Sequence, residues 1–309
     1  MRILFHDLTV DPEPWLAVLR EAFPQADIAV WQPGAPQADY ALVWAPPQQL
    51  LDEQPQLKAL FNIAAGVDAL LKLRLPAGVP VFRLDDAGMA VQMAEYVAQA
   101  VIRYYRELDT VQEDARAGRW QQREPLPRAQ CPVGVMGLGV LGQRVLRGLQ
   151  AFGFPLRGWS RTPKAIEGVQ TFAGPEQWHE FLAGSRVLVN LLPLTPDTEN
   201  ILNRSSLSRL LPGAYLINVA RGRHLVDEDL LALLDNGHLA GALLDVFRQE
   251  PLPAEHPFWR EPRISITPHT SARTLRQESL SQMVAKMAAL QAGAQPDSLG
   301  GLVRPQVGY

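Results

Sequence analysis

The sequence predicts an α/β protein made of two doubly wound parallel-sheet domains, the second inserted into the first. Two sets of short apolar runs separated by helical stretches indicate two sheets, and a helix beyond the last run indicates a return to the first domain. The 309 residues are enough for two domains with ordinary cores. We therefore expect a discontinuous first domain formed by residues 1–95 and 276–309. Residues 96–275, with the connecting helix, are expected to form the second domain.

Five apolar runs early in the chain are the expected strands of the first sheet. They recur at intervals suited to intervening helices, which favours a parallel sheet covered on both faces. The runs are "RILFHD" (2–7), "DIAVW" (27–31), "YALVWA" (40–45), "LKALFNIA" (57–64) and "VPVFRL" (79–84).

A single long helix is expected over residues 92–117. Apolar residues recur there in steps of three and four, which describes one face of a helix, and Gly118 is expected to end it. The face comprises Met93, Val97, Ala100, Val101, Tyr104, Leu108 and Val111. The proline-rich segment "REPLPRAQCP" that follows is expected to be a connector.

Seven further runs are the expected strands of the second sheet. Several are apolar throughout, as strands covered on both faces are. The runs are "PVGVM" (132–136), "PLRGWS" (155–160), "VQTF" (169–172), "RVLVNLL" (186–192), "AYLINVA" (214–220), "AGALLDVF" (240–247) and "ISITPH" (264–269). A last helix is expected from about Leu275 to Ala292.

The composition is that of a soluble globular protein, with 47% apolar and 20% charged residues. A net charge of −3 gives no general attraction to nucleic acid or to an anionic membrane. The single cysteine, Cys131, excludes an internal disulfide and a site with several thiolate ligands, and we expect no metal. We find neither a signal peptide nor a long apolar span, so a cytoplasmic enzyme is the default expectation.

A glycine-rich turn predicts a dinucleotide site. "MGLGVLG" places Gly137, Gly139 and Gly142 between an apolar strand and an amphipathic helix whose face begins at Leu141, which we group with this site. Gly137 permits the tight turn, Gly139 lets the backbone approach a pyrophosphate, and Gly142 lets the helix lie close on the strand. The alternative is an ordinary strand–glycine–helix corner without a ligand. These features favour a Rossmann-type domain.

The next strand ends without the carboxylate that would bind the adenosine ribose of NAD. "WSRTPK" instead places Ser160, Arg161, Thr162 and Lys164 there. A carboxylate would repel a 2′-phosphate, whereas the guanidinium of Arg161 binds one, aided by two hydroxyl groups and a second cation. The sequence therefore favours NADPH as the coenzyme. The alternative is a solvated basic turn.

Three residues at predicted strand ends form a chemically coherent catalytic set: Arg221 in "NVARG", Glu250 in "LDVFRQEP" and His269 in "ITPH". An arginine holds a substrate carboxylate and polarises the adjacent carbonyl, and a histidine supplies a proton near neutral pH. Glu250 is the candidate that orients the imidazole. Asp245 either accepts a hydrogen bond from the nicotinamide amide or caps its loop. The alternatives for the trio are a surface arginine, a solvated acid and a structural histidine, while His224 beside Arg221 is left structural.

These motifs, in this order, resemble the D-2-hydroxyacid dehydrogenase family along the whole chain. The resemblance implies an NADP-binding Rossmann-type domain inserted into a flavodoxin-like substrate domain, with catalysis by Arg221, Glu250 and His269. It also implies that Ala65 and Gly66 in "NIAAGVDALL" offer amide groups to the substrate carboxylate. Trp44 walls the substrate pocket by the same resemblance, or else belongs to the core.

A closer likeness is to bacterial members of the family that reduce glyoxylate and hydroxypyruvate with NADPH. It rests on "VWAPP", "RLDDAGMAVQMAEY", "GFPLRGWSRT", "NLLPLTPDT" and the terminal "GY". It implies reduction of glyoxylate to glycolate and of hydroxypyruvate to glycerate, and a homodimer formed through the helix at 92–117. The alternatives are a nicotinamide-state sensor on the same scaffold and a dehydrogenase of longer 2-oxo acids.

Overall fold

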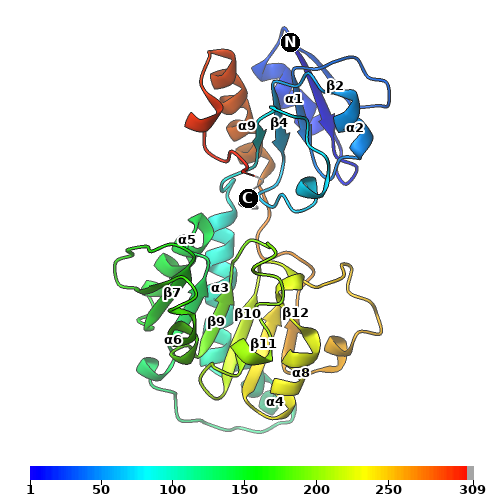
Figure 1. Cartoon of the computed structure of the whole chain (residues 1–309). Coiled ribbons are helices and arrows are strands. Elements are labelled where there is room, and N and C mark those ends of the chain that lie inside the picture. Colours follow the sequence, from blue (N-terminus) through cyan, green and yellow to red (C-terminus); the bar gives the residue numbers. More distant parts are fainter. Residues whose placement is uncertain (305–309) are drawn as a thin grey trace. The chain divides into compact units, whose positions relative to one another are not determined.

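The computed structural model describes residues 1–304. The chain forms two compact units, residues 1–88 together with the segment that begins at Thr274, and residues 89–273 (Figure 1). The terminal "GY", residues 308–309, lies outside the described residues. Each unit contains a sheet of parallel strands connected by helices, which confirms the predicted α/β fold class.

The first unit is built on a five-stranded parallel sheet within the described residues. Its strands are β1 (Arg2–His6), β2 (Asp27–Val30), β3 (Tyr40–Val43), β4 (Ala59–Asn62) and β5 (Val81–Phe82). They follow the order β2-β1-β3-β4-β5, which is the flavodoxin-like order of doubly wound folds. Strands β3 and β4 are buried throughout, as their continuous apolar runs predict.

Helices from both ends of the chain complete this unit. They are α1 (Glu13–Ala22), α2 (Gln48–Glu53) and α9 (Arg276–Gln291), with short 3-10 helices at Leu70–Lys72 and Pro296–Ser298. Helix α9, red in Figure 1, lies beside α1 and buries Leu280, Met283 and Met287 in the same cluster as Phe5 and Phe61 of the sheet. The unit is therefore assembled from discontinuous segments.

The second unit contains a seven-stranded parallel sheet within the described residues. Its strands are β6 (Val133–Met136), β7 (Leu156–Ser160), β8 (Gln170–Ala173), β9 (Val187–Asn190), β10 (Ala214–Asn218), β11 (Leu239–Leu244) and β12 (Ile264–Ile266). The order β12-β11-β10-β9-β6-β7-β8 is a Rossmann order with one additional strand, and it reverses between β6 and β9.

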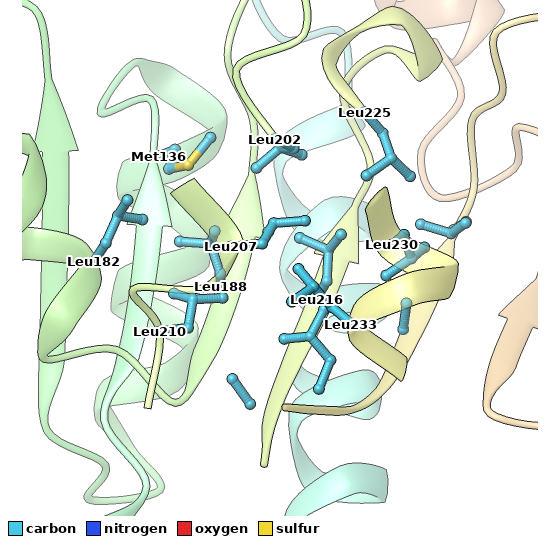
Figure 2. Packing of buried hydrophobic residues seen from close by; sticks show 14 of the residues in the cluster. Met136, Leu182, Leu188, Leu202, Leu207, Leu210, Leu216, Leu225, Leu230 and Leu233 are labelled. Atoms are coloured by element: carbon cyan, nitrogen blue, oxygen red, sulfur yellow. The ribbon is translucent and has the colours of Figure 1, made fainter. Parts of the chain in front are cut away.

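The helices of the second unit are α3 (Met89–Tyr105), α4 (Leu108–Arg116), α5 (Val140–Gln150), α6 (Trp178–Ala183), α7 (Arg204–Leu207) and α8 (Asp227–Asp235). Short 3-10 helices occur at Arg128–Gln130, Gly222–His224 and Pro257–Arg260. One face of the sheet packs against α3 and α5, with Val97 and Val145 in the shared cluster. The other cluster, rich in leucine, is shown in Figure 2, where Leu188, Leu216 and Leu230 are brought together from β9, β10 and α8.

The prediction of one helix over residues 92–117 is wrong at its centre. Helix α3 ends at Tyr105, and Glu107 adopts a left-handed backbone conformation with φ of 50° before α4 begins. The periodic face is buried as far as Val101, but Leu108 and Val111 remain 38% and 44% exposed. The three- and four-residue spacing of apolar residues continues across the break. This spacing does not predict the left-handed backbone conformation of Glu107, which changes the direction of the chain before α4.

The units divide the chain some residues earlier than the expected domains. Helix α3 begins at Met89 and packs on α5 from its first turns, where Ala94 lies against Gly148, so the helix belongs to the second unit as a whole. At the second crossing, the amide of Leu275 donates to the carbonyl of Ala87, which ties residue 275 to the first unit. No helix among the described residues is both long enough and apolar enough to cross a membrane.

Candidate active site

The candidate site lies at the carboxyl edge of the seven-stranded sheet. All of its strands run parallel, so the residues that follow them share one edge. Gly137 follows β6 and Ser160 ends β7, whereas Arg221, Glu250 and His269 follow β10, β11 and β12. The phosphate-binding candidates and the catalytic candidates therefore occupy neighbouring halves of the same edge, separated by β9.

The glycine turn has the geometry that a close-packed phosphate cradle requires. Gly137 has a φ of 94°, and a Cβ there would lie 2.8 Å from the carbonyl oxygen of Leu191. A Cβ on Gly142 would lie 1.9 Å from the carbonyl oxygen of Gly137, so α5 can approach β6 only without that side chain. Gly139 caps α5, and a Cβ there would meet nothing within 4 Å. The open side of Gly139 fits the approach of a dinucleotide pyrophosphate to the helix N-terminus.

The residues after β7 form an exposed basic turn. Ser160 is buried, and its hydroxyl donates to the carbonyl of Thr162 over 2.8 Å, so it shapes the turn. Arg161, Thr162 and Lys164 are exposed. Leu141 is half-buried and packs against the cluster shared by α3 and α5. Within this turn the structure places no carboxylate, which fits a phosphorylated ribose better than a plain one.

His269 and Glu250 form a hydrogen-bonded pair. Nδ1 of His269 lies 2.8 Å from Oε2 of Glu250, and Oε1 of Glu250 accepts from the amide of Phe247 over 2.9 Å. Both side chains are partly open to solvent, at 48% and 38% exposure. Because the carboxylate occupies Nδ1, the other ring nitrogen, Nε2, is left to exchange a proton with a substrate.

The pKa of Glu250 lies below its usual value. Partial burial acts to raise this pKa, but the hydrogen bonds from His269 and the Phe247 amide, with the charges of His269 and Arg221, outweigh burial. Glu250 is therefore the ionised partner at neutral pH, and Arg221 lies close enough to act on it electrostatically. The predicted trio is brought together at one place.

Arg221 is held in an extended conformation just beyond β10. Its carbonyl accepts from the side-chain amide of Asn218 over 3.1 Å, and its Nη1 donates to the carbonyl of Ala220 over 2.6 Å. Gly222 follows, and a Cβ there would lie 1.8 Å from the carbonyl carbon of Phe247. The missing side chain of Gly222 lets the turn that carries Arg221 contact the loop that carries Glu250. This role of Gly222 was not predicted from the sequence, although a glycine directly after Arg221 is a signal of close backbone contact.

Asp245 is fully buried and supports the loop that carries His269. Its Oδ1 accepts from the Thr267 hydroxyl over 2.5 Å and from the Thr270 amide over 2.8 Å, and its Oδ2 accepts from the Ser271 amide over 2.8 Å. Its backbone carbonyl accepts from the amide of His269 over 2.8 Å. Of the two roles left open by the sequence, this geometry favours the loop cap over contact with a nicotinamide.

The substrate-binding candidates Trp44, Ala65 and Gly66 belong to the first unit. The side chain of Asn62, at the end of β4, donates to the carbonyls of Ala64 and Gly66 over 2.8 and 2.9 Å and so shapes their loop. Trp44 is half-buried and packs against the cluster of β1, α1 and α9. In residues 1–304 we find no group of three or more His, Cys, Asp or Glu side chains that would hold a metal ion.

The chain belongs to the D-isomer specific 2-hydroxyacid dehydrogenase family. The family model of its NAD binding domain matches residues 98–271. The chain is 49% identical to glyoxylate/hydroxypyruvate reductase A of Serratia proteamaculans, covering 100% of both chains. It is 47% identical to the protein of the same name from Yersinia enterocolitica, covering 98% of this chain and 99% of the other.

Two solved structures are similar to this chain along its full length. A D-isomer specific 2-hydroxyacid dehydrogenase from Xanthobacter autotrophicus, in complex with NADPH and MES, matches with a TM-score of 0.93 and 39% identity, covering 100% of this chain and 99% of the other. An NADPH-dependent glyoxylate/hydroxypyruvate reductase from Sinorhizobium meliloti, in complex with NADP and sulfate, matches with a TM-score of 0.91, 34% identity and the same coverage. The family named from the sequence is therefore confirmed.

Proposed function

We propose that the protein is an NADPH-dependent reductase of small 2-oxo acids, converting glyoxylate to glycolate and hydroxypyruvate to glycerate. The observation that carries the proposal is the His269–Glu250 pair beside Arg221, on the same sheet edge as the glycine turn. The names of the relatives from Serratia proteamaculans and Sinorhizobium meliloti support the substrate and coenzyme.

In the proposed mechanism, Arg221 binds the substrate carboxylate and polarises the neighbouring carbonyl oxygen with its remaining donors. In the first unit, Ala65 and Gly66, through their backbone amides, and Trp44 are the proposed substrate-binding residues. NADPH, when bound, supplies the hydride that reduces the carbonyl carbon. The alkoxide oxygen takes the proton from Nε2 of His269, and the carboxylate of Glu250 stabilises the charged ring before that transfer and keeps its orientation.

The coenzyme is proposed to lie along β6 and β7. Its pyrophosphate would be held by the backbone of Gly137, Gly139 and the start of α5, with Leu141 and Gly142 shaping that turn. Its 2′-phosphate would be held by Arg161, with Thr162 and Lys164 beside it and Ser160 fixing the turn. The second unit is thus the proposed coenzyme domain and the first unit the proposed substrate domain.

We also propose a homodimer. Helix α4 presents Leu108 and Val111 to solvent, and Trp120 beyond it is 96% exposed. A surface hollow of about 500 Å³ lies among Val111, Ala115 and Trp120. Exposed apolar patches of this kind mark protein interfaces.

A panel of 2-oxo acids assayed with both reduced coenzymes tests the proposed function. We expect oxidation of NADPH with glyoxylate and hydroxypyruvate, and lower kcat/KM as the acyl chain lengthens. A higher kcat/KM for longer 2-oxo acids would contradict the proposed substrate. Tight NADPH binding without turnover on any member of the panel would instead identify a sensor.

A further inference from the structure

A fully buried polar cluster lies directly behind Arg221. It comprises Asn190 at the end of β9, Asn218 at the end of β10 and His224 in the 3-10 helix after Arg221, and none of the three is exposed to solvent. Asn190 and Asn218 face each other as register partners on adjacent strands. Buried polar side chains are costly unless their hydrogen bonds are made, so the pattern of donors and acceptors defines the state of the cluster.

The orientation of the two asparagine side chains follows from their backbone contacts. Oδ1 of Asn190 accepts from the amide of Leu192 over 3.2 Å, which leaves its Nδ2 to donate to Oδ1 of Asn218 over 3.0 Å. Oδ1 of Asn218 also accepts from the amide of Ala220 over 3.3 Å, and its Nδ2 donates to the carbonyl of Arg221. Rotating either amide by half a turn would place donors against donors.

These contacts fix the imidazole of His224 in a single neutral form. Its Nε2 lies 3.2 Å from the carbonyl oxygen of Pro193, which can only accept, so Nε2 carries the proton. Its Nδ1 lies 2.9 Å from Nδ2 of Asn190, an amide donor, so Nδ1 must be the acceptor. A second proton on the ring would oppose the donor of Asn190.

The cluster connects the two halves of the candidate site. On one side, Asn218 and the amide of His224 both donate to the carbonyl of Arg221. On the other side, His224 and Asn190 hold the segment 191–193, whose Leu191 carbonyl oxygen would lie 2.8 Å from a Cβ on Gly137. His224 therefore links the turn that carries Arg221 to the segment 191–193, which packs against Gly137 of the proposed phosphate-binding turn.

We propose that His224 is a positioning residue for the reduction. As a neutral ring it sets the place of Arg221 relative to the glycine turn, and hence of the substrate carboxylate relative to the coenzyme. This inference rests on the proposed function, because it concerns the substrate that Arg221 holds. Misplacement of a substrate by an ångström is sufficient to cost on the order of 100-fold in rate.

Three variants of His224 separate positioning from packing. His224→Phe removes both ring contacts, His224→Asn keeps an acceptor near the position of Nδ1, and His224→Gln keeps a donor near the position of Nε2. We expect His224→Phe to raise the KM for glyoxylate and lower kcat/KM by roughly 10- to 100-fold, while the Kd for NADPH stays within about twofold. Since the link to Arg221 passes through Asn190 and Asn218, His224→Asn should restore the KM more fully than His224→Gln.

His238→Phe is the matched control. Nε2 of His238 also lies 3.2 Å from a backbone carbonyl, that of Leu207, but His238 lies just before β11, at the amino edge of the sheet. Its loss should lower the midpoint of thermal unfolding without changing the KM for glyoxylate. Rates are normalised to the NADPH-binding fraction, so that misfolded protein does not enter kcat.

The outcomes distinguish the two proposals. If wild type reduces glyoxylate but His224→Phe, like His238→Phe, has the wild-type KM for glyoxylate, the positioning role is overturned and the proposed function stands. If wild type reduces no 2-oxo acid, the proposed function is overturned and the positioning role with it. Nitrogen NMR of the wild-type imidazoles should show His224 protonated at Nε2 alone, and a doubly protonated ring at neutral pH would also overturn the inference.

Discussion

His269 has a left-handed backbone conformation, with a φ of 53°, which is uncommon for a residue other than glycine. Such a conformation persists only where the surroundings enforce it. Here the amide of His269 donates to the carbonyl of Asp245, and the amides of Thr270 and Ser271 donate to its buried carboxylate. The strain is therefore sustained by Asp245, and the ring is directed toward Glu250 as a result.

Substituting His269, the proposed proton donor, and substituting Glu250, its hydrogen-bond partner, should lower kcat by different factors. We expect His269→Gln to lower kcat by roughly 100- to 10,000-fold, because no group then protonates the alkoxide. Glu250→Gln should lower kcat less, because the ring remains but its charged form is no longer stabilised. Steady-state rates with saturating NADPH measure both changes. An equal, small loss in the two variants would contradict the assigned roles.

The lowered pKa of Glu250 predicts a dependence of stability on pH. A carboxyl group whose pKa is lower in the folded than in the unfolded state stabilises the fold above the unfolded pKa, and this contribution is lost as the pH falls through the folded pKa. The difference in unfolding free energy between wild type and Glu250→Gln should therefore shrink toward acidic pH. Because the pair is partly exposed, the difference is no more than about 1 kcal/mol. Denaturant unfolding across the acidic range measures it, and a difference that grows on acidification would contradict the account.

The basic turn after β7 predicts the coenzyme preference. Ser160→Asp combined with Arg161→Ala places a carboxylate where the 2′-phosphate is proposed to lie and removes its main cation. Hydrogen bonds to charged groups contribute roughly 1.5–3 kcal/mol, so the preference for NADPH over NADH should fall by roughly 10- to 150-fold. The ratio of kcat/KM for the two coenzymes is the measurement, and an unchanged ratio would refute the role of this turn.

At the scale of elements, the turn between β6 and α5 makes a prediction that separates binding from folding. Gly139→Ala meets no atom within 4 Å, so the free protein should keep its thermal stability while its affinity for NADPH falls. Gly142→Ala places a Cβ 1.9 Å from a carbonyl oxygen and should lower the stability itself. Calorimetry of unfolding together with NADPH titration separates the two. Equal affinities in Gly139→Ala and wild type would place the pyrophosphate elsewhere.

The strands were predictable from the sequence because each is a short apolar run that ends near glycine, proline or a polar residue. The run at residues 186–192 becomes β9, and the run at residues 214–220 becomes β10. The break between α3 and α4 was not predictable in this way. It depends on the conformation of Glu107, and the spacing of apolar residues carries no information about that conformation.

The residue types at the strand ends predicted Arg221, Glu250 and His269 as candidate catalytic residues, and the structure places Glu250 in contact with His269 and within the electrostatic reach of Arg221. The residues that hold these side chains in place could not be predicted from the sequence. Asn190 and Asn218 are the last residues of the apolar strands β9 and β10, and their contact depends on a register between these strands that only the fold supplies. The role of Asp245 as a loop cap likewise depends on contacts with residues more than twenty positions away.

At the scale of the whole molecule, the exposed apolar surface of α4 predicts association. Light scattering at micromolar concentration should give twice the chain mass of 34.2 kDa. Trp120→Glu with Val111→Glu should shift the protein toward the monomer, since both side chains are exposed in the single chain and their replacement removes no contact of its core. Leu8→Glu, at an exposed site of the first unit, is the control. A monomeric wild type would contradict the proposed dimer.

Isotope labelling follows the proposed transfer of hydride from NADPH to glyoxylate directly. Two samples of NADPH are prepared, each with deuterium at one of the two hydride positions of the nicotinamide ring. Each is incubated with glyoxylate and the protein, and the mass of the glycolate is measured by mass spectrometry. We expect glycolate that contains one deuterium from one of the two labelled coenzymes, and we expect its rate of formation to fall sharply in His269→Gln while NADPH binding persists. Glycolate without deuterium from either coenzyme, or no glycolate at all, would contradict it.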